Sequence, residues 1–246
     1  MTSPLWPAEL VLVRHAESAG NLAAKAAEAA GHAVIDIAAR DMDVELSARG
    51  EQQARALGEW LRERDAIPDG VVCSPYRRAE QTAVAAVERA GLACTVSVDE
   101  RLRERDFGML DRLTREGIVA RMPEQAEARG RLGKFYYRPP QGESWTDVAL
   151  RVRAVLDSLS REFPQRRVLV VTHEVVIYVF RYVLERLREH QLLEIARADP
   201  LVNCAVSIFT FDAESEMMRL DQWNSSEALA TLDAPTTHEV DRTVAR

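Results

Sequence analysis

Short apolar runs alternate along the chain with longer segments in which apolar residues recur every three or four positions. The runs at residues 10–13, 71–73 and 168–172 predict buried strands, and the last, which is the most apolar, indicates a central strand. The longer segments have the period of amphipathic helices. Because strands alternate with helices, we expect an α/β fold, a three-layer α/β/α sandwich around a mostly parallel central sheet.

Capping residues mark the ends of the predicted helices. Ser47 is the expected N-cap of one helix, and Ser74 is the expected N-cap of a second, which stops near Gly91. Ser144 opens a third helix, and the acidic residue three positions later completes a capping box. A fourth helix is predicted from about residue 175 to residue 189, directly after the most apolar strand.

The remaining segments are expected to complete the sheet and cover it. Residues 94–98 predict another strand, and residues 205–210 and 217–220 predict a closing hairpin. Residues 19–40 are rich in alanine and predict a helix, either alone or followed by a mobile loop. Residues 99–142 are charged and interrupted by Gly and Pro, so we expect short helices that cover one end of the sheet.

The chain contains no internal repeat and no linker, so we expect a single domain over residues 1–246. The length is sufficient to bury a substantial core, which we expect at about residues 8–222. The polar tail, about residues 224–246, is expected to be flexible.

The composition narrows the class of protein. Apolar residues make up 47% of the chain and charged residues 29%, as in ordinary soluble globular proteins. The net charge of −7 argues against a nucleic acid or an anionic membrane as partner, because both bind clustered Lys and Arg. The sequence has no run of 18 apolar residues, and its three cysteines are far apart. We expect no secretion signal, because residues 1–9 lack a basic segment followed by an apolar one. We therefore expect a cytoplasmic protein with reduced core thiols.

Basic side chains follow three of the predicted strands. Arg14 and His15 follow the first strand, Arg77 and Arg78 follow the second, and His173 follows the most apolar one. Taken singly, each would be a surface or hydrogen-bonding residue. Because the carboxyl ends of parallel strands meet at the edge where open α/β sheets bind ligands, these residues together predict a positive concave site in an acidic protein.

Five segments resemble, in order, the motifs of the histidine phosphatase superfamily, the phosphoglycerate mutase-like group. The first, Arg14-His15-Ala16-Glu17-Ser18 with Asn21, is similar to the signature R-H-G-E-S-x-x-N. The others lie at residues 45–54, 73–82, 102–108 and 172–173, and a further Gly-Glu-Ser loop matches at 142–144. Five motifs in order over about residues 10–210 are highly specific, and the resemblance implies a phosphoglycerate mutase-like fold.

The resemblance also implies a role for each matched residue. His15 would be the nucleophile that takes the phosphoryl group of a small phosphate monoester as a phosphohistidine. Arg14, Arg78 and a protonated His173 would surround this group and stabilise its charge, and nearby phosphate would favour that protonation by raising the pKa of the imidazole. Glu104 would give a proton to the leaving alkoxide and then activate water. Without the resemblance, Glu104 would be interpreted as a solvated ion-pair residue.

Three further residues are candidates for binding the substrate. Ser18 and Asn21 are implied hydrogen-bond donors to the phosphate, with turn or cap residues as the alternative. Arg105 would contact the rest of the substrate or else lie on a solvated face. No metal or other cofactor is implied: the His-Glu pair at 173–174 lacks the second histidine of an H-E-x-x-H motif, because position 177 is isoleucine.

Two positions depart from the motifs. Ala16 replaces a glycine, which asks only for an ordinary backbone conformation there. Glu174 adds an anion that would weaken phosphate binding unless it points away or pairs with an arginine. Residues 22–42 and 109–141 are the least motif-like segments and are expected to determine specificity. Within the second, residues 134–138 would supply aromatic and basic contacts at the rim of the site or pack as a loop.

Two other functions stay open at this point. A mutase would return the phosphoryl group to a second position of a sugar acid, but mutases of the family carry Trp where Gly20 precedes Asn21, which favours hydrolysis. A catalytically weak regulatory or binding member of the same fold is the other alternative, although a binding pocket has no need of a proton donor such as Glu104. The expected partner is a small phosphorylated metabolite. Its identity and the oligomeric state, a homo-oligomer included, are not predicted.

Overall fold

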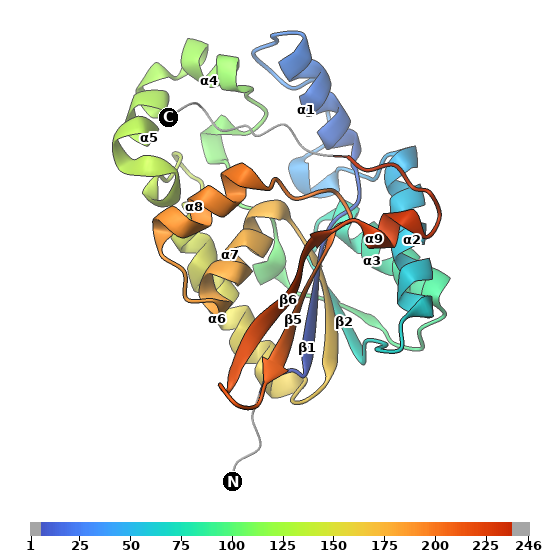
Figure 1. The fold of residues 1–246 in the computed structure, drawn as a ribbon. Coiled ribbons are helices and arrows are strands. Elements are labelled where there is room, and N and C mark those ends of the chain that lie inside the picture. Colours follow the sequence, from blue (N-terminus) through green and yellow to red (C-terminus); the bar gives the residue numbers. More distant parts are fainter. Residues whose placement is uncertain (1–5, 238–246) are drawn as a thin grey trace.

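A mostly parallel sheet forms the centre of the computed structural model, which describes residues 6–237 (Figure 1). The described strands are β1 (Glu9–Arg14), β2 (Gly70–Cys73), β3 (Val96–Val98), β4 (Arg167–Thr172), β5 (Val206–Asp212) and β6 (Met217–Ser225). They pair in the order β3-β2-β4-β1-β5-β6. The first four in this order are parallel, whereas β5 and β6 form the antiparallel closing hairpin. The predicted strands and the predicted central position of β4 are confirmed.

Helices cover both faces of the sheet because successive residues of each strand point to opposite sides. In β1, Leu10 and Leu12 pack into one apolar cluster, and Val11 and Val13 pack into another. The first cluster is covered by α6 (Trp145–Glu162), α7 (Glu174–Leu184) and α8 (Glu189–Ala198). The second is covered by α2 (Ala48–Glu63), α3 (Arg77–Ala90) and α9 (Glu227–Ala230). The three-layer α/β/α architecture is therefore confirmed.

Two long connections lie beyond the carboxyl ends of the parallel strands (Figure 1). The first contains α1 (Ala19–Ala29) and the short helix η1 (Asp41–Asp43). The second contains η2 (Glu100–Leu102), η3 (Gly108–Leu110), α4 (Arg115–Arg121) and α5 (Pro123–Tyr136). A β-bridge between Val34 and Leu113 joins them. Residues 99–142 thus cover one end of the sheet with short helices, as predicted.

Two predicted helix boundaries were wrong. Helix α3 begins at Arg77 with Tyr76 as its N-cap. The Ser74 hydroxyl accepts from the backbone N–H of Tyr76 at 3.2 Å, but residues 75–76 form a bend and not the first turn of the helix. The helix predicted over residues 175–189 is two helices, α7 and α8. Arg186, between them, has φ of 52°, a left-handed conformation that ends an α-helix. No Gly or Pro marks this break in the sequence.

The tail differs in part from the expected flexible segment. Its described portion, residues 224–237, completes β6, forms α9 and then returns to the body of the molecule. There Thr237 is buried, its carbonyl accepts from the N–H of Asn203 at 2.9 Å, and the Pro235 carbonyl accepts from Gln53. Residues 238–246, the rest of that expectation, lie outside the described residues. The single-domain interpretation stays a prediction.

Two further sequence expectations concern the thiols and the membrane. Cys73 and Cys204 are buried, Cys94 is partly buried, and none of the three forms a disulfide within the described chain. Over residues 6–237, the structure contains no helix with the length and apolar character required to cross a bilayer.

Candidate active site

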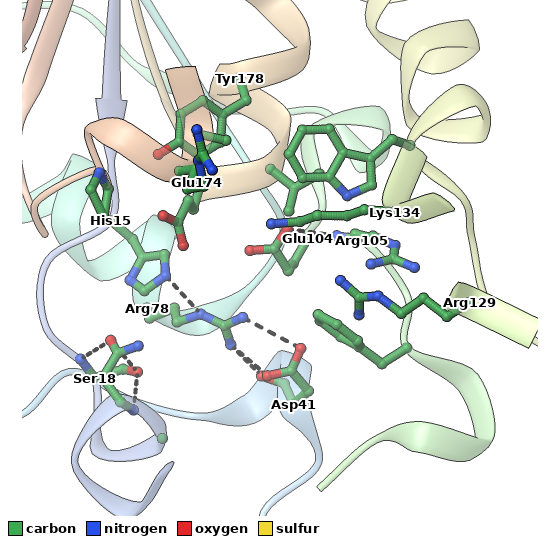
Figure 2. A pocket seen from close by; sticks show the side chains of 18 residues that line it. His15, Ser18, Asp41, Arg78, Glu104, Arg105, Arg129, Lys134, Glu174 and Tyr178 are labelled. Atoms are coloured by element: carbon green, nitrogen blue, oxygen red, sulfur yellow. Dashed lines mark hydrogen bonds and ion pairs between the residues drawn. The ribbon is translucent and has the colours of Figure 1, made fainter. Parts of the chain in front are cut away.

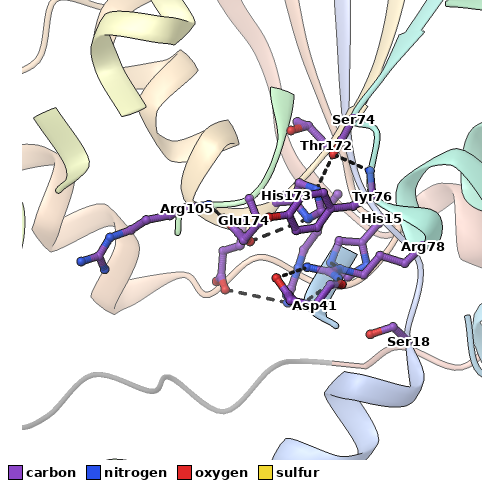
Figure 3. A network of polar contacts seen from close by, with 12 residues as sticks. His15, Ser18, Asp41, Ser74, Tyr76, Arg78, Arg105, Thr172, His173 and Glu174 are labelled. Carbon is purple, nitrogen blue, oxygen red and sulfur yellow. Dashed lines mark hydrogen bonds and ion pairs between the residues drawn. The ribbon is translucent and has the colours of Figure 1, made fainter. Parts of the chain in front are cut away.

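Two histidines and a serine meet where three parallel strands end. His15 follows β1, Ser74 follows β2 and His173 follows β4, and the strand register aligns these ends at one edge of the sheet. The ring centroids of His15 and His173 lie 5.0 Å apart in an edge-to-face arrangement. The Ser74 hydroxyl lies 2.8 Å from Nε2 of His173 (Figure 3). The predicted convergence of the two imidazoles is therefore found.

The contacts of His15 determine where its proton lies. Nδ1 is 2.7 Å from the carbonyl oxygen of Ala16, which can only accept, so Nδ1 carries the hydrogen. Nε2 then holds a lone pair, and it accepts a hydrogen bond from Nε of Arg78 at 3.3 Å. Burial, followed by the charges of Arg78 and Arg14, holds the pKa of His15 well below its ordinary value. The ring is a neutral imidazole with Nε2 as its basic atom.

The backbone that follows His15 is held by side chains from α2 and α3. The N–H of Ala16 donates to the Thr82 hydroxyl at 3.0 Å, and the N–H of Glu17 donates to Oε1 of Gln53 at 2.8 Å. The Glu17 carboxylate accepts from the hydroxyl of Ser47, the N-cap of α2, at 2.8 Å. Two of the sequence motifs, residues 45–54 and 73–82, thus serve to position the loop that carries His15.

Arg78 is the buried arginine of the predicted pair and lies against Asp41. Its Nη1 donates to the backbone carbonyl of Asp41 at 2.6 Å and to Oδ1 at 3.0 Å, and its Nη2 lies 3.4 Å from Oδ2. The guanidinium also lies over the ring of Tyr76, 5.0 Å from its centroid. Arg77 is exposed and pairs with acidic residues at the surface. This agrees with the assignment of Arg78, and not Arg77, to the phosphoryl group. Asp41 was not predicted as a site residue, because it belongs to no motif.

Arg14 lies behind the site rather than in its wall. It is 1% exposed, and its Nη1 donates to the carbonyl of Leu201. Its Nη2 is 3.8 Å from a carboxylate oxygen of Glu174. The extra anion at position 174 therefore pairs with an arginine, one of the two arrangements under which a phosphate site tolerates it.

His173 and Glu104 lie side by side but are not hydrogen-bonded. Nδ1 of His173 is 3.8 Å from Oε2 of Glu104, and Oε1 of Glu104 accepts from the N–H of Arg105 at 2.7 Å. The Thr172 hydroxyl donates to the carbonyl of Leu102 at 2.7 Å, which ties the segment carrying Glu104 to the end of β4. Burial, then the charge of Arg78, lowers the pKa of His173 well below its ordinary value. The predicted protonation of His173 therefore needs the added charge of a phosphate.

A cavity of about 170 Å³ opens over these residues (Figure 2). The predicted site residues in its wall are His15, Ser18, Asn21, Arg78, Glu104 and Arg105. Ser18 and Asn21 also cap α1: each backbone N–H donates to the other residue's side-chain oxygen. The cap interpretation of Ser18 is thus confirmed, although the residue also faces the cavity. Arg14 and His173 are buried beneath this wall.

The outer wall of the cavity combines cations with aromatic rings (Figure 2). Its cations are Arg105, Arg129, Lys134 and Arg197, and its aromatic residues are Phe107, Trp145 and Tyr178. Burial and then the charge of Arg129 lower the pKa of Arg105 to about 10. Of residues 134–138, Lys134 lines the cavity, whereas Phe135 and Tyr137 are packed, so both interpretations of that segment hold in part. Arg129 and Arg197 were missed because no motif contains them.

The arrangement can bind an anion and carry out proton transfer. It combines a neutral imidazole nitrogen, a buried guanidinium and a carboxylate that face one cavity. Such groups suit attack on phosphorus with stabilisation of the developing charge. Within residues 6–237, no group of three or more His, Cys, Asp or Glu side chains is placed to hold a metal ion.

Comparison with known proteins identifies a family and several similar structures. A family model described as "Histidine phosphatase superfamily (branch 1)" matches residues 10–226. Among solved structures, a mycobacterial glucosyl-3-phosphoglycerate phosphatase in complex with VO3 is 30% identical, with a TM-score of 0.68, and the match covers 89% of this chain and 99% of that one. Another structure of this phosphatase contains inorganic phosphate.

Curated relatives include a mutase and a bifunctional protein. A 2,3-bisphosphoglycerate-dependent phosphoglycerate mutase of Methylobacterium radiotolerans is 34% identical, over 78% of this chain and 87% of the mutase. A 6-phosphofructo-2-kinase/fructose-2,6-bisphosphatase of Caenorhabditis elegans is 30% identical over 96% of this chain. The chain spans only 48% of the length of that bifunctional protein, so the match concerns one part of it.

Proposed function

The chain belongs to the histidine phosphatase superfamily, and from this premise we propose that it is a phosphatase that hydrolyses a small phosphate monoester through a phosphohistidine on His15. The observation that carries the proposal is the state of His15. Its Nδ1 is committed to a backbone carbonyl, and its Nε2 keeps a lone pair beside Arg78 at the cavity. A neutral imidazole held in this way is ready to attack phosphorus without first losing a proton.

In the first step, the hydrogen bond from Nε of Arg78 to Nε2 of His15 is given up, Nε2 uses the released lone pair to form a bond to phosphorus, and the bond from phosphorus to the ester oxygen breaks. Glu104, protonated, gives its hydrogen to the departing alkoxide and becomes a carboxylate. Arg78 stabilises the negative charge on the phosphoryl oxygens by direct hydrogen bonds, and Arg14 and His173 act from beneath the cavity wall. The phosphate charge raises the pKa of His173, so that its imidazole becomes cationic when the substrate binds.

In the second step, a water molecule attacks the phosphohistidine. The Glu104 carboxylate takes a proton from this water as the oxygen bonds to phosphorus, and the bond between phosphorus and Nε2 breaks. His15 recovers its lone pair, Glu104 is again protonated and inorganic phosphate leaves. Each group therefore returns to its starting state, and no external acid or base is consumed.

The side chains of the outer wall are suited to bind a particular class of leaving group. Its cations, Arg105, Arg129, Lys134 and Arg197, suit an ester that carries a second anionic group, either a carboxylate or another phosphate. The aromatic residues beside them suit a partly apolar or sugar-like body. The ester named for the mycobacterial relative, glucosyl-3-phosphoglycerate, combines a sugar, a carboxylate and a phosphate, and supports this class.

Mutase activity is the second candidate, because the Methylobacterium relative is a mutase. Hydrolysis is favoured here because Gly20 stands before Asn21, whereas the resemblance gives the classical mutases a Trp at that place. A mutase must keep water away from the phosphohistidine until a second hydroxyl group of the substrate accepts the phosphoryl group.

A screen for phosphate release tests the proposal. It compares sugar phosphates, phosphorylated sugar acids and aryl phosphates, and each reaction is also examined for an isomerised product. We expect release of inorganic phosphate, fastest from phosphorylated acids, and a loss on the order of 10³-fold or more in His15→Ala. Full activity of His15→Ala would refute the nucleophile, and an isomerised product without phosphate release would establish a mutase. Phosphate binding without turnover of any ester would favour a regulatory protein.

A further inference from the structure

Asp41 occupies the face of Arg78 that a phosphate would use. Its carboxylate accepts hydrogen bonds from both Nη groups of the guanidinium, at 3.0 and 3.4 Å, and its backbone carbonyl accepts one from Nη1 at 2.6 Å (Figure 3). Two parallel N–H···O contacts to one anion are the geometry with which arginine binds carboxylate and phosphate alike. Asp41 also lines the cavity, together with His15 and Arg78.

The other contacts of Arg78 leave few of its hydrogens for an incoming anion. Its Nε donates to Nε2 of His15, the atom proposed to attack phosphorus. The five N–H groups of an arginine lie on three nitrogens. The contacts to His15 and Asp41 engage each of these nitrogens. A phosphate that binds Arg78 through both Nη groups must share them with the carboxylate or displace it.

The two anions also repel each other. A phosphate monoester carries up to two negative charges, and Asp41 would lie on the same guanidinium within a few ångströms of it. The side chain of Asp41 is 42% exposed, on the three-residue helix η1 within the connection between α1 and α2. Because water reaches this side chain, it has a solvated position to move to when an anion takes its place.

We propose that Asp41 competes with phosphate for Arg78, and thereby weakens the binding of inorganic phosphate and promotes its release after the second step. This inference rests on the proposed phosphatase function, because it needs a phosphate at Arg78. Asp41 is then a residue that determines affinity: it lowers the occupancy of the site by the product, at the cost of weaker binding of the ester.

Contacts other than those of Asp41 also hold Arg78 in place. A variant of Asp41 is therefore expected to strengthen phosphate binding and not to displace Arg78. The ring of Tyr76 lies under the guanidinium, His15 accepts its Nε, and the backbone carbonyl of Arg78 accepts from the hydroxyl of Thr82 at 2.7 Å. Removal of the Asp41 charge therefore leaves Arg78 in place. Replacement by Asn retains the size of the side chain and one oxygen acceptor, and removes only the charge and one contact.

The experiment compares Asp41→Asn with Asp43→Asn in the full chain. Asp43 lies in the same turn, but it pairs with Arg40 at the surface and does not line the cavity. The inhibition constants of inorganic phosphate and orthovanadate are measured, together with KM for the best ester found in the screen. We expect Asp41→Asn to lower all three about three- to tenfold, as expected for the loss of one like charge near the site, and Asp43→Asn to leave them within about twofold of wild type.

Unchanged constants in Asp41→Asn would overturn the inference. Higher constants would overturn it too, and would make Asp41 a positioning residue for Arg78. A second variant, Asp41→Ala, should change the constants in the same direction as Asp41→Asn, and the melting temperatures of all variants verify folding. A wild-type protein that neither releases nor binds phosphate refutes the proposed function and this inference together. An active wild type with an unaffected Asp41→Asn refutes only the inference.

Discussion

The two buried imidazoles of the site differ in the partners of their ring nitrogens. His15 has a carbonyl at Nδ1, which fixes one tautomer and leaves Nε2 as a base. His173 has a hydroxyl at Nε2, which can donate or accept, and the carboxylate of Glu104 near Nδ1. A second proton on His173 would therefore have a hydroxyl beside one ring nitrogen and a carboxyl group 3.8 Å from the other, whereas a second proton on His15 would face the cation of Arg78. These surroundings support a nucleophile at position 15 and a phosphate-binding cation at position 173.

The role of Glu104 as a proton donor is tested best by esters whose leaving groups differ in basicity. An alkoxide needs a proton as it leaves, whereas a nitrophenolate does not, so loss of the acid should matter only for the first. For Glu104→Gln we expect the first-step rate to fall about 10²-fold or more with an alkyl phosphate and to stay within about tenfold with an aryl phosphate. The variant should then accumulate phosphohistidine, because the same residue activates water.

Rapid-quench measurement of the alcohol released and trapping of the phosphoenzyme provide these rates. Glu100→Gln is the matched control, since Glu100 is exposed and lies in the same segment four residues earlier. An equal loss with both esters would contradict a role as acid and indicate a structural role for Glu104 instead. The contact of Oε1 with the N–H of Arg105 can persist in Gln, which limits the structural change.

Single residues outside the motifs were the least predictable part of the site. His15, Arg78 and Glu104 lie in matched segments, and the structure brings them to one cavity as expected. Asp41 and Arg129 come from the two long connections, in which charged residues are frequent and no spacing distinguishes one from another. Their position depends on how these connections fold over the sheet, which local sequence does not determine.

Among the secondary-structure elements, α2 positions the loop that carries the nucleophile through close backbone contact. A Cβ atom added to Gly50 would lie 1.9 Å from the carbonyl oxygen of Glu17, so a side chain there forces the loop or the helix to move. We expect Gly50→Ala to destabilise the fold by about 1–3 kcal/mol and to reduce activity beyond the loss of folded protein. Chemical denaturation provides the first quantity, and kcat at a temperature where the variant is folded provides the second.

Gly130 in α5 is the matched control for this substitution. No heavy atom lies within 4 Å of a Cβ added there, and the residue is exposed. Gly130→Ala should therefore be neutral or stabilise the helix by up to about 1 kcal/mol. A Gly50→Ala protein as stable and active as Gly130→Ala would show that the loop after His15 tolerates displacement.

The starts of α2 and α6 were predicted correctly because a serine side chain caps each helix, whereas the start of α3 was not. Ser47 and Ser144 accept from the N–H three residues later, and their helices begin where expected. Ser74 has the same residue type, but its hydroxyl contacts His173 from a different strand end, and α3 starts without a side-chain cap. The same hydroxyl accepts from the N–H of Tyr76, so it combines a local turn contact with a long-range contact that the sequence does not indicate.

At the scale of the whole molecule, the charge of the cavity opposes that of the chain. The chain carries −7, whereas the cavity wall contains five cations against three carboxylates. An acidic protein that binds an anion must concentrate its cations in one place, since the rest of the surface repels the ligand. The net charge and the basic residues at the strand ends predict this requirement, whereas the contributions of Arg129 and Arg197 depend on how α5 and α8 fold over the cavity.

The two buried histidines also make the stability of the whole fold depend on pH. Burial lowers the pKa of His15 and of His173 in the folded protein, whereas in the unfolded chain both titrate near the ordinary value of about 6.5. As the pH falls below that value, the unfolded chain binds protons that the folded protein does not, so stability is lost toward acid. The limiting slope is about 1.4 kcal/mol per pH unit for each histidine.

We expect the free energy of unfolding to fall between pH 7 and pH 5.5, and the slope to decrease in the double variant His15→Gln/His173→Gln. Denaturant titrations across this range measure the slope, which remains informative even if the variant is less stable at every pH. His190→Gln, at an exposed position, is the matched control. A double variant with the wild-type slope would mean that the two buried imidazoles bind protons over the same pH range in the folded and the unfolded protein.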